Sequence, residues 1–453
     1  MVTALVLAHN GIENIELVVK SFQLFCDVEV SLVIVDDGTT DGLQDWAKDQ
    51  EDITYVFLDE GKMNSGAVLN MVRKELGIDT DLLTMEGNYM LTPKHLSRLC
   101  ELLHAEEEIG AVSGIVCNDI RYNPNLILDV QDYKEAIDMV DTDENAKGKY
   151  ALMPHNHVVL WKKDMLDEIG GFDENVNSLR AVTDDYCIRT IKADKKIMVC
   201  TNALLWCLDL NRQREELDLL DVDYWDVLEK KWGMHYFNDI YNVMLIDLIE
   251  EEKENGFSVL EIGCDCGATL LEIKNRFPKA EVYGSEINVA SAGIASHVAN
   301  VVVNNIEEEN LPFPERKFDY IIFGDVLEHL HNPLKTVVYC QRFLRENGHI
   351  IASIPNIQHI SVMEGLMQGD FTYMESGLLD KTHIHFFTYN EIVRMFHEAG
   401  YEICSLKGSG VPISDRQNEL IDQLLALEGR AQRFMYIAFQ YNLKAKMRKD
   451  VES

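Results

Sequence analysis

The stretch from Val259 to Leu271, VLEIGCDCGATLL, restricts the possible folds more than any other part of the chain. An apolar run that is typical of a buried strand leads into a turn with Gly263 and Gly267, and a helical pattern follows. Glycine permits backbone angles that other residues avoid, so a ligand can lie against the main chain there. The N–H groups from Ala268 onward would face an anion. The stretch therefore predicts a nucleotide-cofactor loop in a doubly wound α/β domain.

A carboxylate follows this loop at a suitable distance. Glu286 comes nineteen residues after Gly267, at the end of the next expected strand in EVYGSEIN. A carboxylate at that place can accept both hydroxyls of a ribose. The loop departs from G-x-G-x-x-G, because Asp265 occupies the middle place and no third glycine follows at the right interval. A dinucleotide is therefore the less favoured ligand.

The chain contains the motif E-x-G-x-x-x-G, with FDYIIFGDVLEHL downstream. With these motifs, about residues 232–446 resemble class I S-adenosylmethionine-dependent methyltransferases. The resemblance implies that the glycine loop meets the methionine end of the cofactor, that the acid after the second strand holds the ribose, and that a pair after the third strand meets the adenine. A doubly wound domain without a cofactor is the alternative. The residues assigned to the cofactor in this way are Glu261, Gly263, Gly267, Glu286, Asn305, Ile306 and Asp325.

Two further stretches, DVLEHL at 325–330 and residues 354–388, closely match the methyltransferases of this kind that act on sugars and small metabolites. Transfer of a methyl group to oxygen needs a hydroxyl that is held near the methyl group and gives up its proton. His383 oriented by Asp380 is the preferred base, and His329 is the second choice. These histidines, with His385, could instead only stabilise their loop.

Charge and cysteine usage limit the partners and the compartment. The formal net charge is -36 and the pI is about 4.7, so binding to nucleic acid or to an anionic membrane by charge is not expected. Ten scattered cysteines favour reduced thiols, and Cys264 and Cys266 favour loop packing over zinc. No apolar run reaches about eighteen residues, and the first residues read as a strand. We expect a cytoplasmic protein without a membrane span.

The first half alternates short β-rich runs with helical patterns, which predicts a parallel sheet with helices on both faces. Ligands of such sheets lie beyond the carboxyl ends of the strands. At 453 residues the chain exceeds the usual size of one core, so two domains are expected. Strands are predicted near Thr3–Ala8, Val30–Val35, Thr54–Leu58, Leu82–Met85, Ala111–Cys117 and Ile197–Thr201.

Three motifs in this half occur in a particular order: VIVDDGTTDG, NSGAVLN, and GGFDE followed by an acidic cluster. In this order and spacing they resemble the inverting glycosyltransferases of GT-A fold, of the family-two kind, over about residues 1–207. The resemblance implies a nucleotide-sugar donor and a glycan or glycoprotein acceptor. The residues assigned to the nucleotide sugar are Asp36, Asp37, Asn64, Glu86 and Asn88.

The metal site implied by this second resemblance is weakened. A D-x-D motif binds Mn²⁺ or Mg²⁺ in the family, whereas Glu86 and Asn88 stand at its two places here, so one carboxylate is replaced by an amide. ALLWCLDL after the last strand offers no histidine ligand either. The base is expected to be Asp184 or Asp185, two alternatives that the sequence does not separate. These acids could instead stabilise the start of a helix.

The sequence thus predicts a GT-A domain at 1–208, a helical connector at 209–231 and a Rossmann-like methyltransferase domain at 232–453. An amphipathic helix is expected at 232–252, and the stretch 433–445 matches the last strand of the methyltransferase fold. The first hypothesis is a bifunctional glycosyltransferase and O-methyltransferase in bacterial surface-polysaccharide, flagellin or other glycoprotein biosynthesis. The second hypothesis is a methyltransferase whose degenerate glycosyltransferase-like domain only binds the glycan, and the third is an assembly scaffold.

Overall fold

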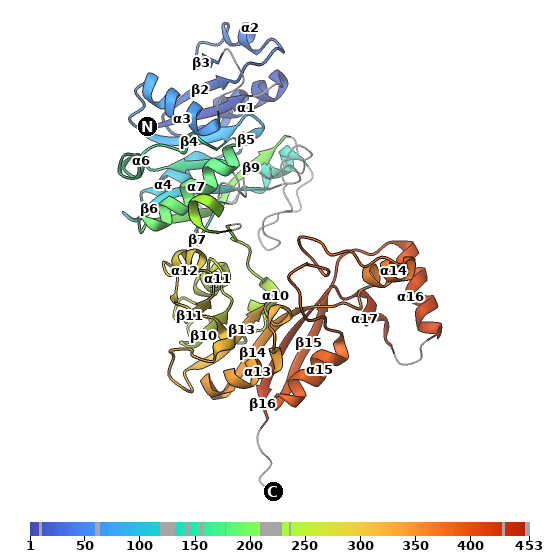
Figure 1. Ribbon diagram of the computed structural model, residues 1–453. Coiled ribbons are helices and arrows are strands. Elements are labelled where there is room, and N and C mark those ends of the chain that lie inside the picture. Colours follow the sequence, from blue (N-terminus) through green and yellow to red (C-terminus); the bar gives the residue numbers. More distant parts are fainter. Residues whose placement is uncertain are drawn as a thin grey trace. The chain divides into compact units, whose positions relative to one another are not determined.

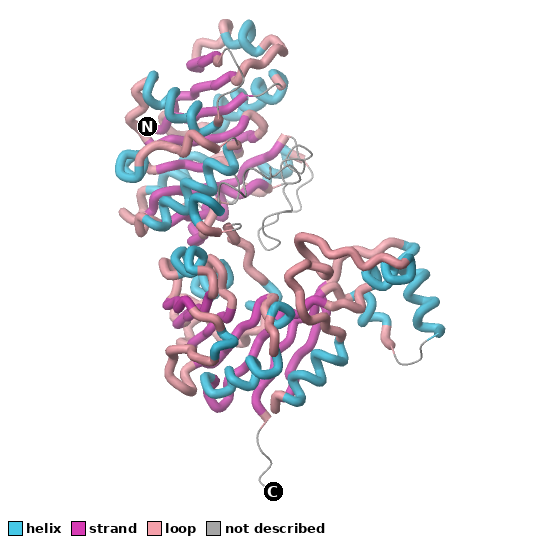
Figure 2. Tube along the Cα trace, viewed as in Figure 1, coloured by secondary structure: helices cyan, strands magenta, loops and turns pink. Residues whose placement is uncertain are grey.

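The computed structural model describes residues 1–8, 11–58, 64–117, 132–140, 145–154, 157–176, 178–208, 229–234, 237–427 and 431–448. The chain divides into two compact units, Met1–Asp239 and Ile240–Ser453. Each unit has a β-sheet with helices packed against it, as Figure 1 shows by element and Figure 2 by secondary structure. The α/β fold class predicted from the sequence is therefore confirmed. Within the described ranges, none of the helices has both the length and the apolar character needed to cross a bilayer.

The first unit is built on a nine-stranded mixed sheet of order β3-β2-β1-β4-β8-β6-β9-β5, with β7 paired to β9. Its strands are β1 Val2–Ala8, β2 Val30–Asp36, β3 Ile53–Phe57, β4 Asp81–Glu86, β5 Tyr89–Leu91, β6 Ile109–Val116, β7 Gly148–Ala151, β8 Val159–Trp161 and β9 Lys196–Cys207. Its helices are α1 Ile12–Phe25, α2 Leu43–Ala47, α3 Ser65–Glu75, α4 His95–Leu103, α5 Tyr133–Asp138, α6 Lys163–Ile169 and α7 Leu179–Lys192.

All six strands predicted in this half are present, as β1, β2, β3, β4, β6 and β9. The expectation of a parallel sheet is right for β3, β2, β1 and β4 and for the β6–β9 pair. It is wrong for the strands that the sequence did not predict, because β5, β7 and β8 run antiparallel to their neighbours. β8 has only three residues, all fully buried, so no alternation of polar and apolar residues marks it in the sequence.

The second unit has a seven-stranded sheet of order β12-β11-β10-β13-β14-β16-β15, in which β16 runs opposite to the other six strands. Its strands are β10 Ser258–Ile262, β11 Glu281–Glu286, β12 Asn300–Val303, β13 Phe318–Gly324, β14 Leu344–Pro355, β15 Tyr401–Ser409 and β16 Gln440–Met447. Its helices are α10 Val243–Ile246, α11 Ala268–Arg276, α12 Val289–Ala295, α13 Pro333–Cys340, α14 Ile360–Gln368, α15 Tyr389–Glu398, α16 Asp415–Leu427 and α17 Arg433–Ile437, with 3₁₀ turns η1 Ile306–Glu308, η2 Leu327–His329 and η3 Gln341–Phe343.

Two sequence expectations for this half need correction. The amphipathic helix expected at 232–252 is not formed, and the described part of that stretch contains only the four-residue α10. Gly233, with φ of 72°, ends the helical turn at 229–232, since this backbone conformation is not helical. The last strand begins at Gln440 rather than within an uninterrupted run from Arg433, because α17 comes first. Most of the predicted connector, residues 209–228, lies outside the described residues.

Helix α3 packs very closely against the loop that carries the GGFDE motif. A Cβ atom on Gly66 would lie 1.9 Å from the backbone oxygen of Asp173. Asn70 makes two hydrogen bonds to the backbone of Phe172: its amide donates to the carbonyl at 2.9 Å, and its oxygen accepts from the N–H at 2.8 Å. Two motifs that lie about a hundred residues apart are thus joined by direct contacts.

Replacing Gly66 tests this packing. We expect Gly66→Ala to lower the unfolding free energy of the first unit by about 1–3 kcal/mol, because the added methyl group overlaps backbone that cannot rotate away. Gly293→Ala in α12, where an added Cβ meets nothing within 4 Å, is the matched control and should be neutral or stabilising by about 0.5–1 kcal/mol. Urea unfolding measures both changes. Equal effects of the two substitutions would show that the close approach of α3 is not a real constraint.

Candidate active site

The glycine turn of the second unit has the strained geometry that its sequence predicts. Gly263 and Gly267 have φ of 69° and 89°, and Asp265 between them also has a positive φ, of 45°. The N–H of Gly263 donates to the carbonyl of Ser285 at 2.8 Å, which joins the end of β10 to the end of β11. A Cβ on Gly263 would lie 2.6 Å from the side chain of Val326. Glycine is therefore required here for both conformation and space.

Glu286 closes this turn from the end of β11. One of its carboxylate oxygens accepts a hydrogen bond from the N–H of Asp265 at 2.9 Å, and the other accepts from the N–H of Asn288 at 2.7 Å. The residue is 7% exposed. Burial raises the pKa of the Glu286 carboxyl, and the nearby Asp265 carboxylate adds to the increase. The predicted ribose-binding acid thus lies at the carboxyl edge of the sheet in a fixed orientation.

Glu261, in β10, brings a third carboxyl group to the same place. It is 4% exposed, and its Oε2 atom is buried without a hydrogen-bond partner. Burial raises the pKa of Glu261 to about 8; a hydrogen bond from Thr269 opposes this increase, and the charges of Asp265 and Glu286 add to it. An unpaired buried oxygen among three acids fits a ligand that brings a hydrogen-bond donor and positive charge. S-adenosylmethionine, with its sulfonium and ammonium groups, has this chemistry.

The remaining residues assigned to the cofactor lie in the loops after β12 and β13. Asn305 caps η1 by accepting from the N–H of Glu307 at 3.1 Å. The Ile306 side chain belongs to the hydrophobic core, so only its backbone is available to a ligand. Asp325 has φ of 55°, and its side chain accepts a hydrogen bond from Gln440. These loops begin where neighbouring parallel strands end, at the edge that also carries Glu286.

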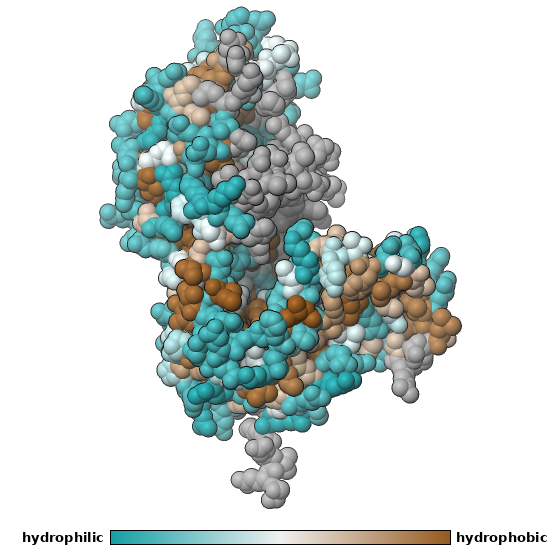
Figure 3. Space-filling model, viewed as in Figure 1, coloured by the Kyte–Doolittle hydropathy of each residue, from teal (hydrophilic) through white to brown (hydrophobic). Residues whose placement is uncertain are grey.

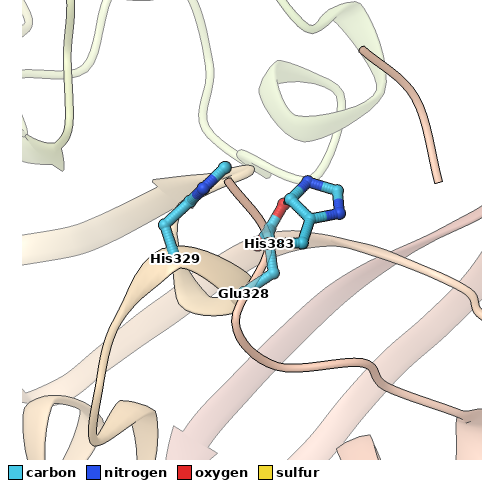
Figure 4. A group of neighbouring side chains, drawn as sticks. All are labelled: Glu328, His329 and His383. Atoms are coloured by element: carbon cyan, nitrogen blue, oxygen red, sulfur yellow. The ribbon is translucent and has the colours of Figure 1, made fainter. Parts of the chain in front are cut away.

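Glu328, His329 and His383 come together beyond this edge, and Figure 4 shows their side chains gathered in one group. Glu328 and His329 lie on η2, whereas His383 comes from the loop between α14 and α15. The Nε2 atom of His383 lies 4.0 Å from Oε1 of Glu328, and the two imidazole ring centres are 4.8 Å apart. The two segments are connected because the Glu328 carbonyl accepts hydrogen bonds from the N–H groups of Ile384 and His385, each at 3.0 Å.

The structure brings the predicted pair His383 and Asp380 together, but without a hydrogen bond between the Asp380 carboxylate and the His383 ring. The Asp380 carboxylate accepts two hydrogen bonds from Thr382, at 2.7 Å from its N–H and 2.6 Å from its hydroxyl. Burial alone would raise the pKa of Asp380, but these two bonds lower it overall. Asp380 contacts His383 through its backbone carbonyl at 3.1 Å. The carboxylate facing the His383 ring is Glu328, which was missed although it stands beside His329 in DVLEHL.

Aromatic side chains extend the site beside His383, and none of them was predicted. Phe386 lies with its ring centre 6.5 Å from that of His383 and 5.7 Å from that of Phe371. Phe371 also contacts Tyr373 at 5.7 Å, edge to face. Phe371 and Tyr373 are 38% and 54% exposed, which is unusual for side chains of this size. His385 turns elsewhere, with Nε2 3.2 Å from the carbonyl of His331.

In the first unit, three of the predicted nucleotide-sugar residues, Asp36, Asp37 and Glu86, lie at one edge of the sheet. The strand register places Asp36 beside Ala8 and Glu86 beside Leu7, at the carboxyl ends of β2 and β4. Asp36 is fully buried and accepts hydrogen bonds from the N–H and hydroxyl of Thr39, at 2.8 and 2.9 Å, and from the hydroxyl of Tyr55. Its neighbour Asp37 follows β2 directly and donates its N–H to the Ala8 carbonyl at 3.2 Å.

Asn88 and Asn64 have different surroundings. Asn88 is 4% exposed, and its side-chain oxygen has no hydrogen-bond partner among the described residues. The amide of Asn64 donates to the carbonyl of Glu174 at 2.9 Å, so this side chain contributes to the same loop contact as Asn70. The structure therefore leaves the oxygen of Asn88 available at the predicted metal position and gives Asn64 a structural contact.

The two candidate bases of the first unit have different contacts. Asp185 forms an ion pair with Lys231 at 2.6 Å and accepts a hydrogen bond from the indole of Trp232 at 2.9 Å. Asp184 lies 3.9 Å from the Arg180 guanidinium. Neither acid is at a helix start, because Ser178 caps α7 and the helix begins at Leu179. The alternative of acids placed to favour the helix dipole is therefore wrong for both.

Comparison with known proteins concerns mainly the second unit. Residues 235–406 match a protein family described as a methyltransferase domain. An uncharacterized protein of Methanocaldococcus jannaschii is 25% identical over 205 residues, 42% of this chain and 79% of that protein. A ubiquinone biosynthesis O-methyltransferase of Acinetobacter baylyi is 23% identical over 205 residues, 43% of this chain and 82% of that protein.

Among solved structures, a SAM-dependent methyltransferase of Archaeoglobus fulgidus is 16% identical, with a TM-score of 0.33, over 49% of this chain and 100% of that chain. The family match shows that the second half of the chain contains a methyltransferase domain with a Rossmann-like fold, which supports S-adenosylmethionine as its cofactor. The match does not extend over residues 1–234. The methyltransferase part of the sequence interpretation is thus confirmed at this level.

The raised pKa of Glu261 predicts a pH-dependent stability. Its folded-state pKa of about 8 lies above the ordinary value, so its contribution stabilises the ligand-free protein at low pH and is lost as the pH rises toward 8. We expect the unfolding free energy of wild type relative to Glu261→Gln to fall by about 1–3 kcal/mol between about pH 5 and pH 8. Urea unfolding at several pH values measures this difference. Glu281→Gln, at the exposed start of the next strand, should show no such trend.

Proposed function

We propose that the second unit is a methyltransferase that transfers the methyl group of S-adenosylmethionine to a hydroxyl oxygen. The observation that carries this proposal is the turn between β10 and α11, where two glycines with positive φ lie beside the carboxyl groups of Glu261, Asp265 and Glu286. Such a turn brings main-chain N–H groups and negative charge to one small place. The family match over residues 235–406 supports the same activity.

In this proposal, different residues of the chain bind different parts of the cofactor. S-adenosylmethionine, when bound, supplies a methyl group on a positively charged sulfur atom. Glu286 accepts the ribose hydroxyls, because its carboxylate already points to the carboxyl edge of β11. The Gly263–Gly267 turn and the buried Glu261 hold the methionine end. Asn305 and the backbone of Ile306 border the adenine.

The acceptor hydroxyl is held at Glu328, His329 and His383. His383 is the first candidate for the group that activates the hydroxyl, since its ring lies between a buried carboxylate and the aromatic residues. His329 is exposed and lies 4.8 Å away by ring centres, so it is the second candidate. The histidines favour a hydroxyl acceptor, because an oxygen nucleophile must lose a proton and an imidazole can accept one near neutral pH.

The surface near this cluster favours an acceptor that carries a ring. α14 and the loop after it expose several large apolar side chains, and Figure 3 shows brown and tan surface on the part of the unit that carries α14 and α16. Aromatic side chains can stack on the flat face of a sugar or an aromatic ring. The exposed residues are Leu366, Met367, Phe371, Tyr373 and Met374.

For the first unit we propose nucleotide-sugar-dependent glycosyl transfer as a second function. The specific observation is the placement of Asp36 and Glu86 at one carboxyl edge, together with the buried, unpartnered oxygen of Asn88. Asp184 and Asp185 both remain candidate bases, since each lies close to a basic group, Asp184 to Arg180 and Asp185 to Lys231. The two units would then act on one glycan. The competing proposal is that the first unit only binds the glycan for the methyltransferase.

Cofactor binding tests the proposal for the second unit. Calorimetric titration with S-adenosylhomocysteine should show one site per chain, and Glu286→Gln should weaken binding by about 10–100-fold, because it removes a charged acceptor of ribose hydrogen bonds. Glu281→Gln, on the same strand, is the control and should bind like wild type. Methyl transfer to a panel of sugars and phenols, followed by mass spectrometry, identifies the acceptor. If wild type binds no S-adenosylhomocysteine, the proposal for this unit is wrong.

Nucleotide binding tests the first unit. We expect the melting temperature to rise when UDP-sugars, GDP-sugars or dTDP-sugars are added with Mn²⁺, and to rise less without the cation, because an acid and an amide alone bind the diphosphate poorly. Asn88→Ala should remove the effect of Mn²⁺ but not the fold. A shift with free glycans and none with any nucleotide sugar would favour the binding function over transfer.

A further inference from the structure

We propose that Glu328, His329 and His383 bind one divalent transition-metal cation, and that this cation holds the acceptor oxygen for methyl transfer. The role of the cation rests on the proposed methyltransferase function, but its binding does not. One ligand atom from each residue lies within 4.8 Å of the other two, so a single ion can reach all three. Figure 4 shows the two imidazoles and the carboxylate gathered around one region.

The strongest sign of a missing positive charge is Glu328. Its side chain is 1% exposed, and neither carboxylate oxygen accepts a hydrogen bond from any residue in the described part of the chain. A buried carboxylate in this situation has a high free energy unless it is paired. A bound cation would supply that pairing.

The hydrogen bonds of His329 leave the correct nitrogen free for a metal. Its Nδ1 atom lies 3.2 Å from both the carbonyl and the hydroxyl oxygen of Thr382. The Thr382 hydroxyl uses its single proton in the bond to Asp380, so both of these oxygens can only accept from the imidazole. Nδ1 must therefore carry the proton, and Nε2 keeps a lone pair.

His383 is arranged in the same way. Its Nδ1 atom lies 3.4 Å from the carbonyl of Leu378, which can only accept a hydrogen bond. The proton is again placed on Nδ1, and the Nε2 lone pair faces Oε1 of Glu328 at 4.0 Å. Metal-bound histidines commonly donate their other N–H to a backbone carbonyl, which fixes the tautomer and the ring orientation. Both histidines of the cluster satisfy this condition before any metal binds.

The ligand set indicates the class of cation. Two imidazole nitrogens and one carboxylate oxygen suit Zn²⁺, Co²⁺, Fe²⁺ or Mn²⁺ better than Ca²⁺, which prefers oxygen ligands. Ligands around such an ion, at bonds of about 2.1 Å, lie about 3–3.5 Å apart, so the three residues must move slightly closer together. The exposed position of the His329 side chain allows such a movement. Three protein ligands leave open positions for other oxygens.

An open position explains how the site could serve an acceptor. A hydroxyl oxygen bound to a divalent cation has a lower pKa, so its proton can leave to solvent water and the oxygen becomes a better nucleophile. With a cation bound, activation of the hydroxyl by the cation would replace the role as base that the proposed function gives to His383 or His329, because the same Nε2 atoms cannot bind a metal and accept a proton. The aromatic side chains of Phe371, Tyr373 and Phe386 would border the rest of the acceptor.

Binding of Co²⁺ and Zn²⁺ to the full chain tests the proposal. Calorimetric titration of wild type should show one equivalent more than His329→Ala and His383→Ala, and the Co²⁺ form should have visible absorption that these variants lack. Residual affinity in the variants should be at least about tenfold weaker. Glu328→Gln keeps the side-chain volume and should give the same loss, so a folding defect is distinguished from the loss of a ligand.

His331→Ala is the matched control. His331 lies two residues after His329, its side chain is 87% exposed, and its Nδ1 atom contacts Glu307 at 2.9 Å, away from the cluster. This variant should bind the metals like wild type. Equal metal stoichiometry in wild type and His329→Ala would overturn the inference.

Titration of the same proteins with S-adenosylhomocysteine separates the two proposals. Normal binding of this cofactor product without a metal site would overturn only the metal site. Metal binding without cofactor binding would overturn only the proposed methyltransferase function. If both hold, a chelator should abolish methyl transfer by wild type, and Co²⁺ should restore it.

Discussion

The geometry of the candidate site in the second unit depends on the contacts between the carboxyl ends of β10 and β11. The N–H of Gly263 bonds to the Ser285 carbonyl, and the N–H of Asp265 bonds to the Glu286 carboxylate, so the turn and the end of the next strand hold each other. Only glycine fits at Gly263, since a side chain there would overlap Val326. A single turn thus sets the backbone, the acidic groups and the position of the loop after β13.

Local features of this turn were predictable from sequence because they depend on neighbours along the chain. The strand, the two glycines and the acid nineteen residues later all lie where the pattern placed them. Glu328 was not predictable as a site residue. Its importance comes from complete burial without a partner, and burial depends on segments more than fifty residues away, such as that of His383. The hydrogen bonds from Thr382 to the Asp380 carboxylate are local by contrast, because the two residues are only two positions apart.

In the first unit, several residues of the sequence motifs make structural contacts within the protein. One motif that the sequence connects with a sugar donor contains Asn64, Gly66 and Asn70. In the structure, the two asparagine side chains bond to the loop at 171–174, and the missing side chain of Gly66 lets α3 approach that loop closely. Asp185 likewise stabilises Lys231 and Trp232. A motif can be recognised in sequence whether its residues touch a ligand or only pack. The strands were easier to predict because their apolar runs are long, except where a strand has only three residues, as in β8.

The two backbone N–H groups that donate to the Glu286 carboxylate would lower the entropic cost of binding a cofactor in the proposed function. A glutamate at a protein surface usually samples several rotamers, and selecting one of them on binding costs about 0.5–1.5 kcal/mol. Here Asp265 and Asn288 have already selected the rotamer during folding. A ribose would then bind to a carboxylate whose rotamer is already fixed. The conformational entropy of this side chain is lost when the protein folds and not when the cofactor binds.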